Sequence, residues 1–340
     1  MLKMAGPSAM SKGRKKYLFA GDVMLGRMVN EVLQRKPPEY PWGDTLTIFR
    51  KVAWRFCNLE CVLANSWNPA SLPNKAFHFR SDAKNIAVLQ AAGIDAVSLA
   101  NNHTLDFGQE ALADTLDALD RAGIGHSGAG KDIGAASSAA ICQVEGLKVA
   151  VISFTDNEPD WEAGLVQQGI FYLPTSPDDP RTERLLQIIR TARTEADLVF
   201  VSAHWGPNWG HSPPKSHIPF SRLLINAGAD LVIGHSPHIF QGIEIYRERP
   251  IIYSAGDFID DYAVDPEQRN DESFIFVFES DGEGIRNLKL YPTLIRACQA
   301  RLATGDDARR VASKMANLCL DFQTSTVWHD QECCLEIGGD

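Results

Sequence analysis

Short apolar runs that end in polar residues alternate along the chain with segments of helical periodicity. Leu112, Leu116 and Leu119 recur at spacings of four and three residues, which predicts an amphipathic helix over residues 109–122. Gly123 is typical of a helix C-terminus. Because strands alternate with helices of this length, we predict a layered α/β fold. Strands are expected at 17–21, 53–60, 94–100, 147–154, 198–203, 230–234, 251–254 and 274–278, and further helices near 27–35, 82–92, 181–195 and 217–227.

The stretch Ser98-Leu-Ala-Asn-Asn-His-Thr-Leu-Asp106 joins the predicted strand at 94–100 to the helix that follows it. Open α/β sheets bind ligands at the carboxyl ends of their strands, so this polar stretch marks a candidate site. Asn and Asp also shape turns and cap helices, and this structural role is the alternative for Asn101, Asn102 and Asp106. Matching groups at other strand ends would favour a site.

Four other predicted strand ends also carry residues that can bind a metal ion. Asp22 follows the run at 17–21, and Glu60 ends the strand at 53–60. Imidazole together with carboxylate and amide oxygens suits a borderline divalent ion such as Zn, Fe or Mn. Two such ions bridged by a carboxylate form a dinuclear hydrolytic centre. Histidines follow the two later strands: His204, His235 and His238.

The composition is that of an ordinary globular chain. Its 340 residues suit one large domain or two small ones. With 33 basic and 43 acidic residues, the formal charge of -10 argues against nonspecific binding to nucleic acid or to an anionic membrane. Residues 1–16 precede no apolar stretch long enough for a signal peptide or a membrane span. We therefore expect a cytoplasmic protein without a membrane span, whose residues 1–16 form a disordered leader.

The seven cysteines do not resemble a secreted disulfide framework, because their number is odd and their spacing does not repeat. Cys57, Cys61 and Cys142 lie in or beside apolar segments, where we expect buried thiols. Cys333 and Cys334 are adjacent, and they are either redox-active or part of a tail without a function. The sequence leaves this choice open.

Several motifs occur together in order along the chain: Gly21-Asp-Val-Met-Leu-Gly-Arg27, Asn58-Leu-Glu60, Ser98 to Gly108, Gly128-Ala-Gly130, His204-Trp-Gly206, Gly234-His-Ser-Pro-His238 and Ile252-Tyr-Ser-Ala-Gly-Asp-Phe258. They resemble the CapA or poly-γ-glutamate biosynthesis family, a branch of the calcineurin-like metallophosphoesterase superfamily. The resemblance covers residues 17–297 as one domain and leaves 298–340 as a C-terminal extension with a helix at 306–320. It implies a four-layer α-β-β-α sandwich of the metallo-dependent phosphatase type, with a metal site at the strand ends between the sheets.

The resemblance also implies a role for each residue of the site. Asp22 matches the first-motif aspartate, and Glu60 stands where the wider superfamily has its bridging aspartate. His103 matches a histidine that often serves as acid or electrostatic stabiliser, and Asp106 would orient it. Asn101 keeps a structural role. The other implied metal ligands are the asparagine Asn102 and the later histidines His204, His235 and His238.

Met24 departs from the superfamily's Asp-x-His motif, because a thioether cannot replace imidazole for these ions. The first metal position then keeps only Asp22, Glu60 and His238. We expect one or two divalent ions, with Mn, Zn or Fe ahead of Mg and Ca, and we expect the second position to fill first while the first stays weak or empty. The second position would comprise Glu60, Asn102, His204 and His235.

Asp257 is a further departure, since the family usually shows asparagine in its Gly-Asn-Phe motif. With Asp260 and Asp261 nearby, the rim of the site is more acidic than the family pattern. Asp257 could compensate for the missing ligand or repel an anionic substrate. The sequence does not decide between these.

Three functions are compatible with this site. A metal-dependent hydrolase or transferase would act on an amide, a γ-glutamyl peptide or a phosphoester, with His103 as general acid. Arg80 is a candidate for binding the substrate's carboxylate or phosphate, and a salt-bridging arginine is its alternative. Abstraction of a Cα proton in the same pocket would instead epimerise a peptide. The third is a noncatalytic accessory protein of polymer synthesis. The expected partner is a peptide or small-molecule substrate, and the oligomeric state stays open.

Overall fold

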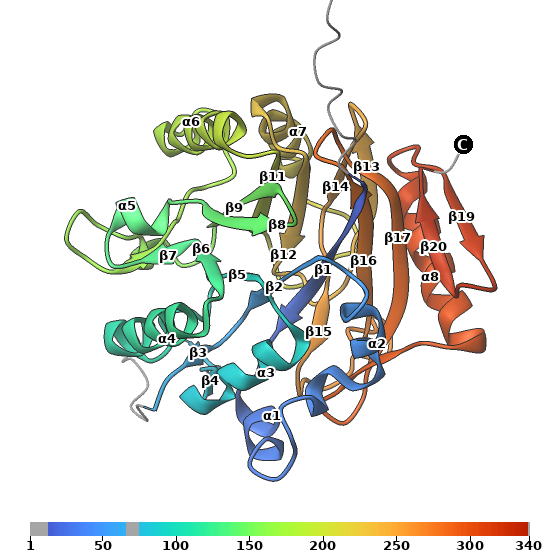
Figure 1. Cartoon of the computed structure of the whole chain (residues 1–340), viewed down its shortest axis with the longest axis horizontal. Coiled ribbons are helices and arrows are strands. Elements are labelled where there is room, and N and C mark those ends of the chain that lie inside the picture. Colours follow the sequence, from blue (N-terminus) through green and yellow to red (C-terminus); the bar gives the residue numbers. More distant parts are fainter. Residues whose placement is uncertain (1–12, 66–74, 339–340) are drawn as a thin grey trace, which may run out of the picture.

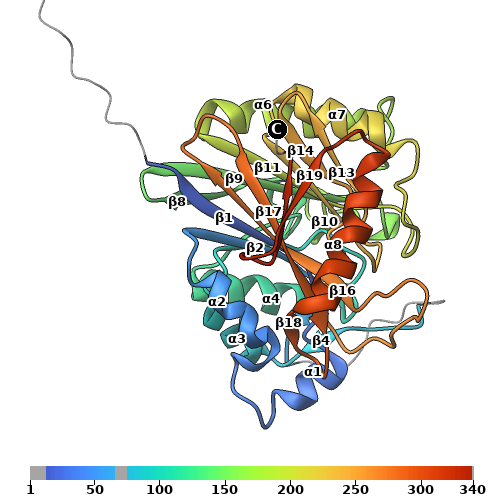
Figure 2. The same ribbon diagram turned by 90° about the vertical axis from the view of Figure 1, so that its right-hand side faces the viewer.

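The computed structural model of the chain describes residues 13–65 and 75–338. Two large sheets lie face to face, and helices cover the outer side of each (Figures 1 and 2). The predicted four-layer α-β-β-α sandwich is therefore confirmed. Most of the predicted leader at 1–16 lies outside the described residues, and the first strand, β1 (Lys15–Val23), begins within its last two residues.

The first sheet has a parallel half and an antiparallel half. From β1, the parallel half continues through β2 (Trp54–Leu59), β5 (Ala96–Ser98) and β6 (Gly125–Ser127). On the other side of β1, antiparallel β16 (Glu272–Ser280) is followed by β17 (Arg286–Ile295). The remaining strands of this sheet are β15 (Asp257–Ile259) beside β1, and β18 (Ala300–Leu302), β20 (Cys334–Ile337) and β19 (Thr326–His329) beyond β17.

The second sheet has a parallel centre with antiparallel edges. Its centre consists of β9 (Leu147–Thr155), β11 (Leu198–His204), β12 (Leu231–His235) and β14 (Arg249–Ile252). These strands match apolar runs of the sequence because they are buried on both faces, and such strands need no polar alternation. The edge strands are β8 (Ala140–Val144) and β13 (Ile243–Tyr246), and two short ladders join β3 (Val62–Leu63) to β4 (Arg80–Ser81) and β7 (Ala129–Gly130) to β10 (Gly169–Ile170).

Aromatic side chains from both sheets fill the space between them. The rings of Phe19 on β1 and Phe200 on β11 lie 5.2 Å apart edge to face, and Trp54 on β2 lies 5.6 Å from Phe200. Successive side chains of β1 point to opposite faces of the sheet: Tyr17 joins this inner core, while Leu18 packs on the helix side. Apolar burial between the sheets therefore fixes the position of their strand ends.

The helices follow the predicted ranges closely. On the first sheet, the amphipathic prediction at 109–122 becomes α4 (Gly108–Ala122), which ends at Gly123 with a left-handed φ of 70°. On the second sheet, α6 (Pro180–Glu195) and α7 (His217–Ala227) form the opposite outer layer (Figure 2). The other helices are α1 (Arg27–Val32), η1 (Tyr40–Thr45), α2 (Leu46–Phe49), η2 (Ala83–Asn85), α3 (Ile86–Ala92), α5 (Ile133–Ala136), η3 (Pro159–Trp161) and α8 (Gly305–Leu320).

The tail beyond residue 297 is built into the sandwich. Its strand β18 pairs with β17, and β20 pairs with β17 on the same sheet. The buried face of α8, which includes Val311 and Met315, joins the core between the two sheets (Figure 2). Residues 300–337 thus extend the first sheet and close one edge of the inner core.

The cysteines, all seven of which lie in the described ranges, are free thiols. Cys57 and Cys61 are buried as predicted, whereas Cys142 is only partly buried. Within the described residues, no helix combines the length and the apolar character that crossing a membrane would need.

Candidate metal centre

The carboxyl ends of the central strands of both sheets meet at one place. Asp22 at the end of β1 and Asn58 on β2 are register partners, and Glu60 follows β2 directly. On the second sheet, His204 and His235 are partners at the ends of β11 and β12. Parallel strands in register place their ends together, so residues far apart in the sequence face one another across the gap between the sheets.

Asp22, Glu60 and His204 form the centre of this cluster. Each offers a ligand atom within 4.8 Å of the others, and all three side chains are buried. Asp22 Oδ1 lies 2.7 Å from His235 Nδ1 and accepts a hydrogen bond of 2.9 Å from Asn58 Nδ2. These contacts link Asp22, an expected ligand of the first metal position, with His204 and His235, which are expected at the second position.

Four buried polar atoms of the cluster have no hydrogen-bond partner among the described residues. An unpaired buried polar atom costs free energy, so each needs a ligand or a water. Carboxylate, amide oxygen and imidazole nitrogen are all ligands of divalent ions. The chemistry of the donor set therefore fits a divalent cation. The four atoms are Asp22 Oδ2, Glu60 Oε2, Asn102 Oδ1 and His235 Nε2.

The electrostatics of the cluster also favour a cation. Burial raises the pKa of Glu60 well above its ordinary value, and the nearby carboxylates of Asp22 and Asp257 raise it further. Burial acts in the same direction on Asp22, but the His235 imidazole outweighs it and lowers the pKa of Asp22 to about 2. Burial lowers the pKa of His204 to about 3, so its imidazole is neutral and keeps a lone pair for a metal.

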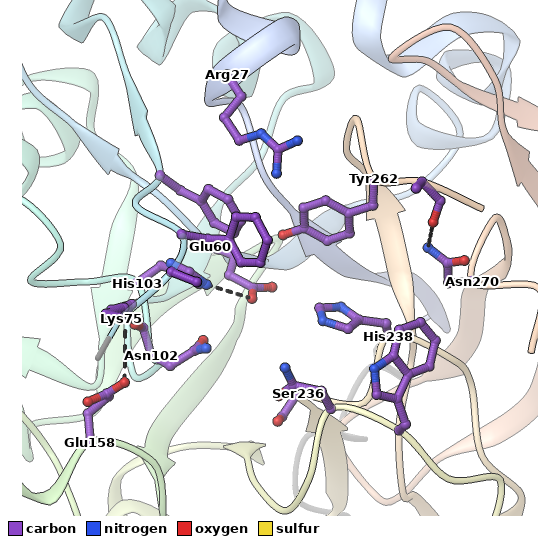
Figure 3. Close-up of a pocket in the computed structure, with 16 residues that line it drawn as sticks. Arg27, Glu60, Lys75, Asn102, His103, Glu158, Ser236, His238, Tyr262 and Asn270 are labelled. Carbon is purple, nitrogen blue, oxygen red and sulfur yellow. Dashed lines mark hydrogen bonds and ion pairs between the residues drawn. The ribbon is translucent and has the colours of Figure 1, made fainter. Parts of the chain in front are cut away.

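His103 is held beside the cluster by Asp106 and Lys75. Asp106 Oδ2 lies 2.6 Å from His103 Nδ1, and Lys75 Nζ lies 2.7 Å from Asp106 Oδ1. The ring of Phe79 stacks on His103 with centroids 3.9 Å apart. Burial lowers the pKa of His103, although the Asp106 carboxylate partly opposes this. His103 Nε2 then faces Glu60, whose Oε1 is 3.9 Å away (Figure 3).

The polar stretch after β5 divides into structural and site residues. Asn101 is fully buried, and its Nδ2 donates to Asn58 Oδ1 and to the Leu59 carbonyl. Asn102, in contrast, lines a cavity with its neighbour His103. The N-cap of α4 is Phe107, so Asp106 does not cap that helix. The turn-and-cap alternative therefore describes Asn101 and does not describe Asp106.

A cavity of about 450 Å³ opens beside this centre (Figure 3). Glu60, Asn102, His103 and His238 form its polar wall. Its other lining residues combine cations with aromatic rings, a mixture that suits an organic anion. Those residues are Arg27, Lys75, Phe77, Phe79, Trp209 and Tyr262, with Glu158 and Asn270 among the remaining polar ones.

Arg27 lines the cavity and was not assigned to the site from the sequence. Its guanidinium carbon lies 5.6, 5.8 and 5.9 Å from the ring centroids of Phe77, Phe79 and Tyr262. Asp261 Oδ2 lies 3.4 Å from Arg27 Nε. The rings and the carboxylate hold the guanidinium at the cavity wall. Its place at the end of the Gly21 to Arg27 motif was the one available signal.

The contacts of Arg80 match the salt-bridging alternative of the sequence analysis. Its side chain is 4% exposed, Nη2 lies 3.1 Å from Asp82 Oδ1, and Nη1 donates to the Ala64 carbonyl. The pairing of β3 with β4 sets Val62 opposite Arg80 and fixes this inward orientation. Among the described residues that line the cavity, Arg80 is absent. Of the two roles considered for Arg80, these contacts favour the structural one over binding of the substrate's anion.

Comparisons with known proteins agree with this fold. A family model described as bacterial capsule synthesis protein PGA_cap matches residues 16–262. The capsule biosynthesis protein CapA of Bacillus anthracis is 28% identical over 336 residues, which cover 94% of this chain and 76% of that protein. A Mycobacterium tuberculosis protein, named as a polyglutamine synthesis accessory protein, is 31% identical over 283 residues, covering 72% of this chain and 74% of its own length.

The likeness to solved structures concerns the fold. A structure described as a phosphatase, from Mycoplasma pneumoniae, superposes with a TM-score of 0.53 at 12% identity and covers 83% of this chain and 94% of its own. This places the sandwich among metallo-dependent phosphatase folds. By its motifs, its fold and the match over residues 16–262, the chain belongs to the bacterial capsule synthesis protein family PGA_cap, the CapA family.

Proposed function

We propose that the protein is a metal-dependent hydrolase or transferase that acts on a γ-glutamyl amide or a phosphoester. One observation carries this proposal: buried ligand atoms of Asp22, Glu60 and His204 converge, and Glu60 lines one cavity together with His103, which Asp106 holds. The names of the relatives, which refer to capsule and polyglutamine synthesis, favour the γ-glutamyl amide. Asn102, His235 and His238 complete the proposed ligand set for one or two ions, with Mn, Zn or Fe as the expected metals.

The proposed chemistry divides between the metal and His103. A divalent ion bound at this set would activate water and polarise the scissile group. His103 Nε2 faces the cavity, while Nδ1 is held by the Asp106 carboxylate, which fixes the orientation of the ring. In its neutral form His103 accepts a proton at Nε2, and in its protonated form it returns that proton to the leaving group. The lowered pKa of His103 favours this release.

Arg27 takes the anion-binding role that the sequence analysis gave to Arg80. Its planar guanidinium matches either a carboxylate or a phosphate, and the three surrounding rings hold it in place before substrate binds. A γ-glutamyl unit offers a free α-carboxylate, and a phosphoester offers phosphate oxygens. Both substrate classes therefore fit the same position of the cavity wall.

The test compares turnover before and after removal of metal. Chelator-treated protein would be reloaded with Mn, Zn or Fe and assayed with γ-glutamyl oligopeptides and with an aryl phosphate. We expect metal-dependent release of glutamate or phosphate that His204→Ala abolishes. His329→Ala is the matched control, because His329 lies on β19 and contacts Glu336 instead of the centre. If no metal restores turnover of either substrate, the hydrolase proposal is refuted.

An accessory role without catalysis is the second candidate, because one relative is named as an accessory protein. In that case the cavity would bind a polymer or a protein without turning it over. Alanine at Asp22, His204 and His235 separates the two functions. If metal content and polymer production in cells both survive these changes, the accessory function is favoured. Loss of both favours the enzyme.

A further inference from the structure

Met24 does not supply a ligand to the metal centre. Its side chain is 1% exposed and belongs to the core on the helix side of the first sheet. Its Sδ accepts a hydrogen bond of 3.0 Å from the backbone N–H of Gly26. The first metal position therefore lacks the ligand that the superfamily places at this point of the chain, and another side chain would have to replace it.

Asp257 lies where such a replacement is needed. It begins β15, which runs parallel to β1, and Asp22 is its register partner there. Asp257 Oδ1 lies 3.1 Å from His238 Nδ1. The side chain is 1% exposed, and Oδ2 has no hydrogen-bond partner among the described residues. Asp257 thus joins Asp22 and His238, two of the three ligands expected at the first position.

A positive charge would stabilise the buried carboxyl groups around Asp257. Asp22, Glu60, Asp257 and Asp260 are each at most 4% exposed, and each has one oxygen without a hydrogen-bond partner in the described part of the chain. The ion-pair partners of the first three are histidines. Several buried carboxylates without a full positive charge are costly, and a divalent ion would supply that charge.

We propose that Asp257 is a metal ligand that stands in for the missing histidine, so that this protein binds two divalent ions. Asp22, Glu60, Asp257 and His238 form the first position, and the inference rests on the metal centre of the proposed function. Three carboxylates favour a hard ion such as Mn²⁺ or Mg²⁺. The second position, with two imidazoles, favours Zn²⁺ or Fe²⁺. This differs from the sequence expectation of a weak or empty first position.

A simpler role for Asp257 would be to orient His238 through its Nδ1 without touching a metal. The two roles differ in what they require of residue 257. Asparagine retains an oxygen that accepts the hydrogen bond from His238 but loses the negative charge. Alanine loses both. An orienting role therefore makes Asp257→Asn weaken the first ion by about tenfold to a hundredfold, whereas a ligand role weakens that ion further.

The experiment counts bound metal directly. Chelator-treated full-length protein is titrated with Mn²⁺ in a calorimeter, and bound metal is then measured by mass spectrometry. We expect two ions in the wild type, one in Asp257→Ala and in His238→Ala, and binding of one ion weakened by more than about a hundredfold in Asp257→Asn. Asp261→Asn is the matched control, since Asp261 pairs with Arg27, and it should keep two ions. One ion in the wild type, or two ions in Asp257→Asn with neither weakened by more than about a hundredfold, would overturn the proposal.

Melting temperatures show whether a variant binds less metal because it has lost a ligand or because its fold is destabilised. Metal-free Asp257→Asn should melt at or above the metal-free wild type, because a buried charge has been removed, while Mn²⁺ should stabilise the wild type more than the variant. A metal-free variant that melts well below the wild type would indicate a packing role and contradict the proposal. If two ions bind and Asp257→Ala loses one, but neither substrate is turned over, the metal site stands and the hydrolase function fails.

Discussion

Asp106 Oδ2 lies 2.6 Å from His103 Nδ1, and the same oxygen accepts a hydrogen bond of 2.6 Å from the backbone N–H of Phe79. This carboxylate therefore ties the polar stretch after β5 to the segment that precedes β4. It also holds the His103 ring against Phe79 with Nε2 directed to the cavity. The orientation of the proposed acid and base thus depends on two segments that are separate in the sequence.

Replacing His103 should remove a proton-transfer group while the metal centre stays intact. We expect His103→Ala to lower kcat by about 10² to 10⁴, and Asp106→Asn by about tenfold to a hundredfold, since it keeps the imidazole and weakens the contact that orients it. Steady-state kinetics of metal-loaded protein would measure both. Metal content serves as the control, and equal kcat in wild type and His103→Ala would remove His103 from the mechanism.

Lys75 should stabilise the fold through Asp106. Its side chain is 13% exposed and that of Asp106 is 0% exposed, so Lys75→Met leaves a buried carboxylate without its cation. We expect the free energy of unfolding to fall by about 3 kcal/mol. Chemical denaturation would measure it. Lys75→Met with Asp106→Asn should recover part of the loss, and additive effects of the two changes would contradict the coupling.

Arg27 and Arg80 should respond differently to the same substitution. Arg27→Met removes the guanidinium from the cavity wall, so KM for an anionic substrate should rise about tenfold or more with little change in kcat. Arg80→Met instead removes the ion pair with Asp82 and the hydrogen bond to the Ala64 carbonyl, and should lower the melting temperature. Kinetics and thermal denaturation of the two variants would separate these roles. A KM effect confined to Arg80→Met would restore the original assignment.

Removal of metal should destabilise the folded chain. An ion that binds the native state at a concentration a hundredfold above its Kd adds about 2.7 kcal/mol to the free energy of unfolding. We therefore expect a chelator to lower the melting temperature of the wild type and Mn²⁺ to restore it. His204→Ala, which lacks a central ligand, should show a much smaller shift. Equal shifts in both proteins would argue against a metal bound by His204.

Lys314 on α8 should make stability depend on pH in the alkaline range. Burial lowers its pKa to about 8, and the neighbouring Arg269 and Arg310 add to this effect. The folded state then binds fewer protons than the unfolded state between pH 8 and the ordinary lysine pKa, so stability rises with pH over that window. Lys314→Met should therefore be more stable than the wild type at pH 7, and the difference should shrink by pH 10.

Lys289 is the matched control for this pH dependence. Its ammonium lies 2.7 Å from Glu332, and this hydrogen bond raises its pKa. Lys289→Met should show no gain in stability at pH 7. Denaturation at pH 7 and pH 10 would compare the two variants. A gain for Lys289→Met as large as that for Lys314→Met would mean that removing any lysine from this acidic protein has the same effect.

Local pattern accounts for the parts of the fold that the sequence predicted well. The central strands β9, β11 and β12 are continuous apolar runs because helices cover one face and the other sheet covers the second. Leu112, Leu116 and Leu119 mark the buried side of α4. In both cases the burial of a residue depends on its spacing from near neighbours, which can be read from the sequence.

The strand β17 and the tail show where local pattern was insufficient. Leu288 and Leu290 alternate with half-exposed residues over only part of β17, so the apolar signal is short. The tail strand β20 pairs with the distant strand β17, and β19 pairs with β20 to form the edge of the sheet. No local spacing encodes that partner. The sequence therefore indicated α8 but not the strands around it.

The order of apolar and polar residues is enough to predict which polar groups stand at strand ends, and hence the candidate ligands from Asp22 to His238. Their pairing could be seen only once the chain was folded: Asp22 with His235, Asp257 with His238, and Asp106 with Lys75. The same holds for Arg27, which lines the cavity, and for Arg80, which pairs with Asp82. The physical reason is that position along a strand follows from local burial, whereas contacts between strand ends depend on sheet register and on packing between the layers.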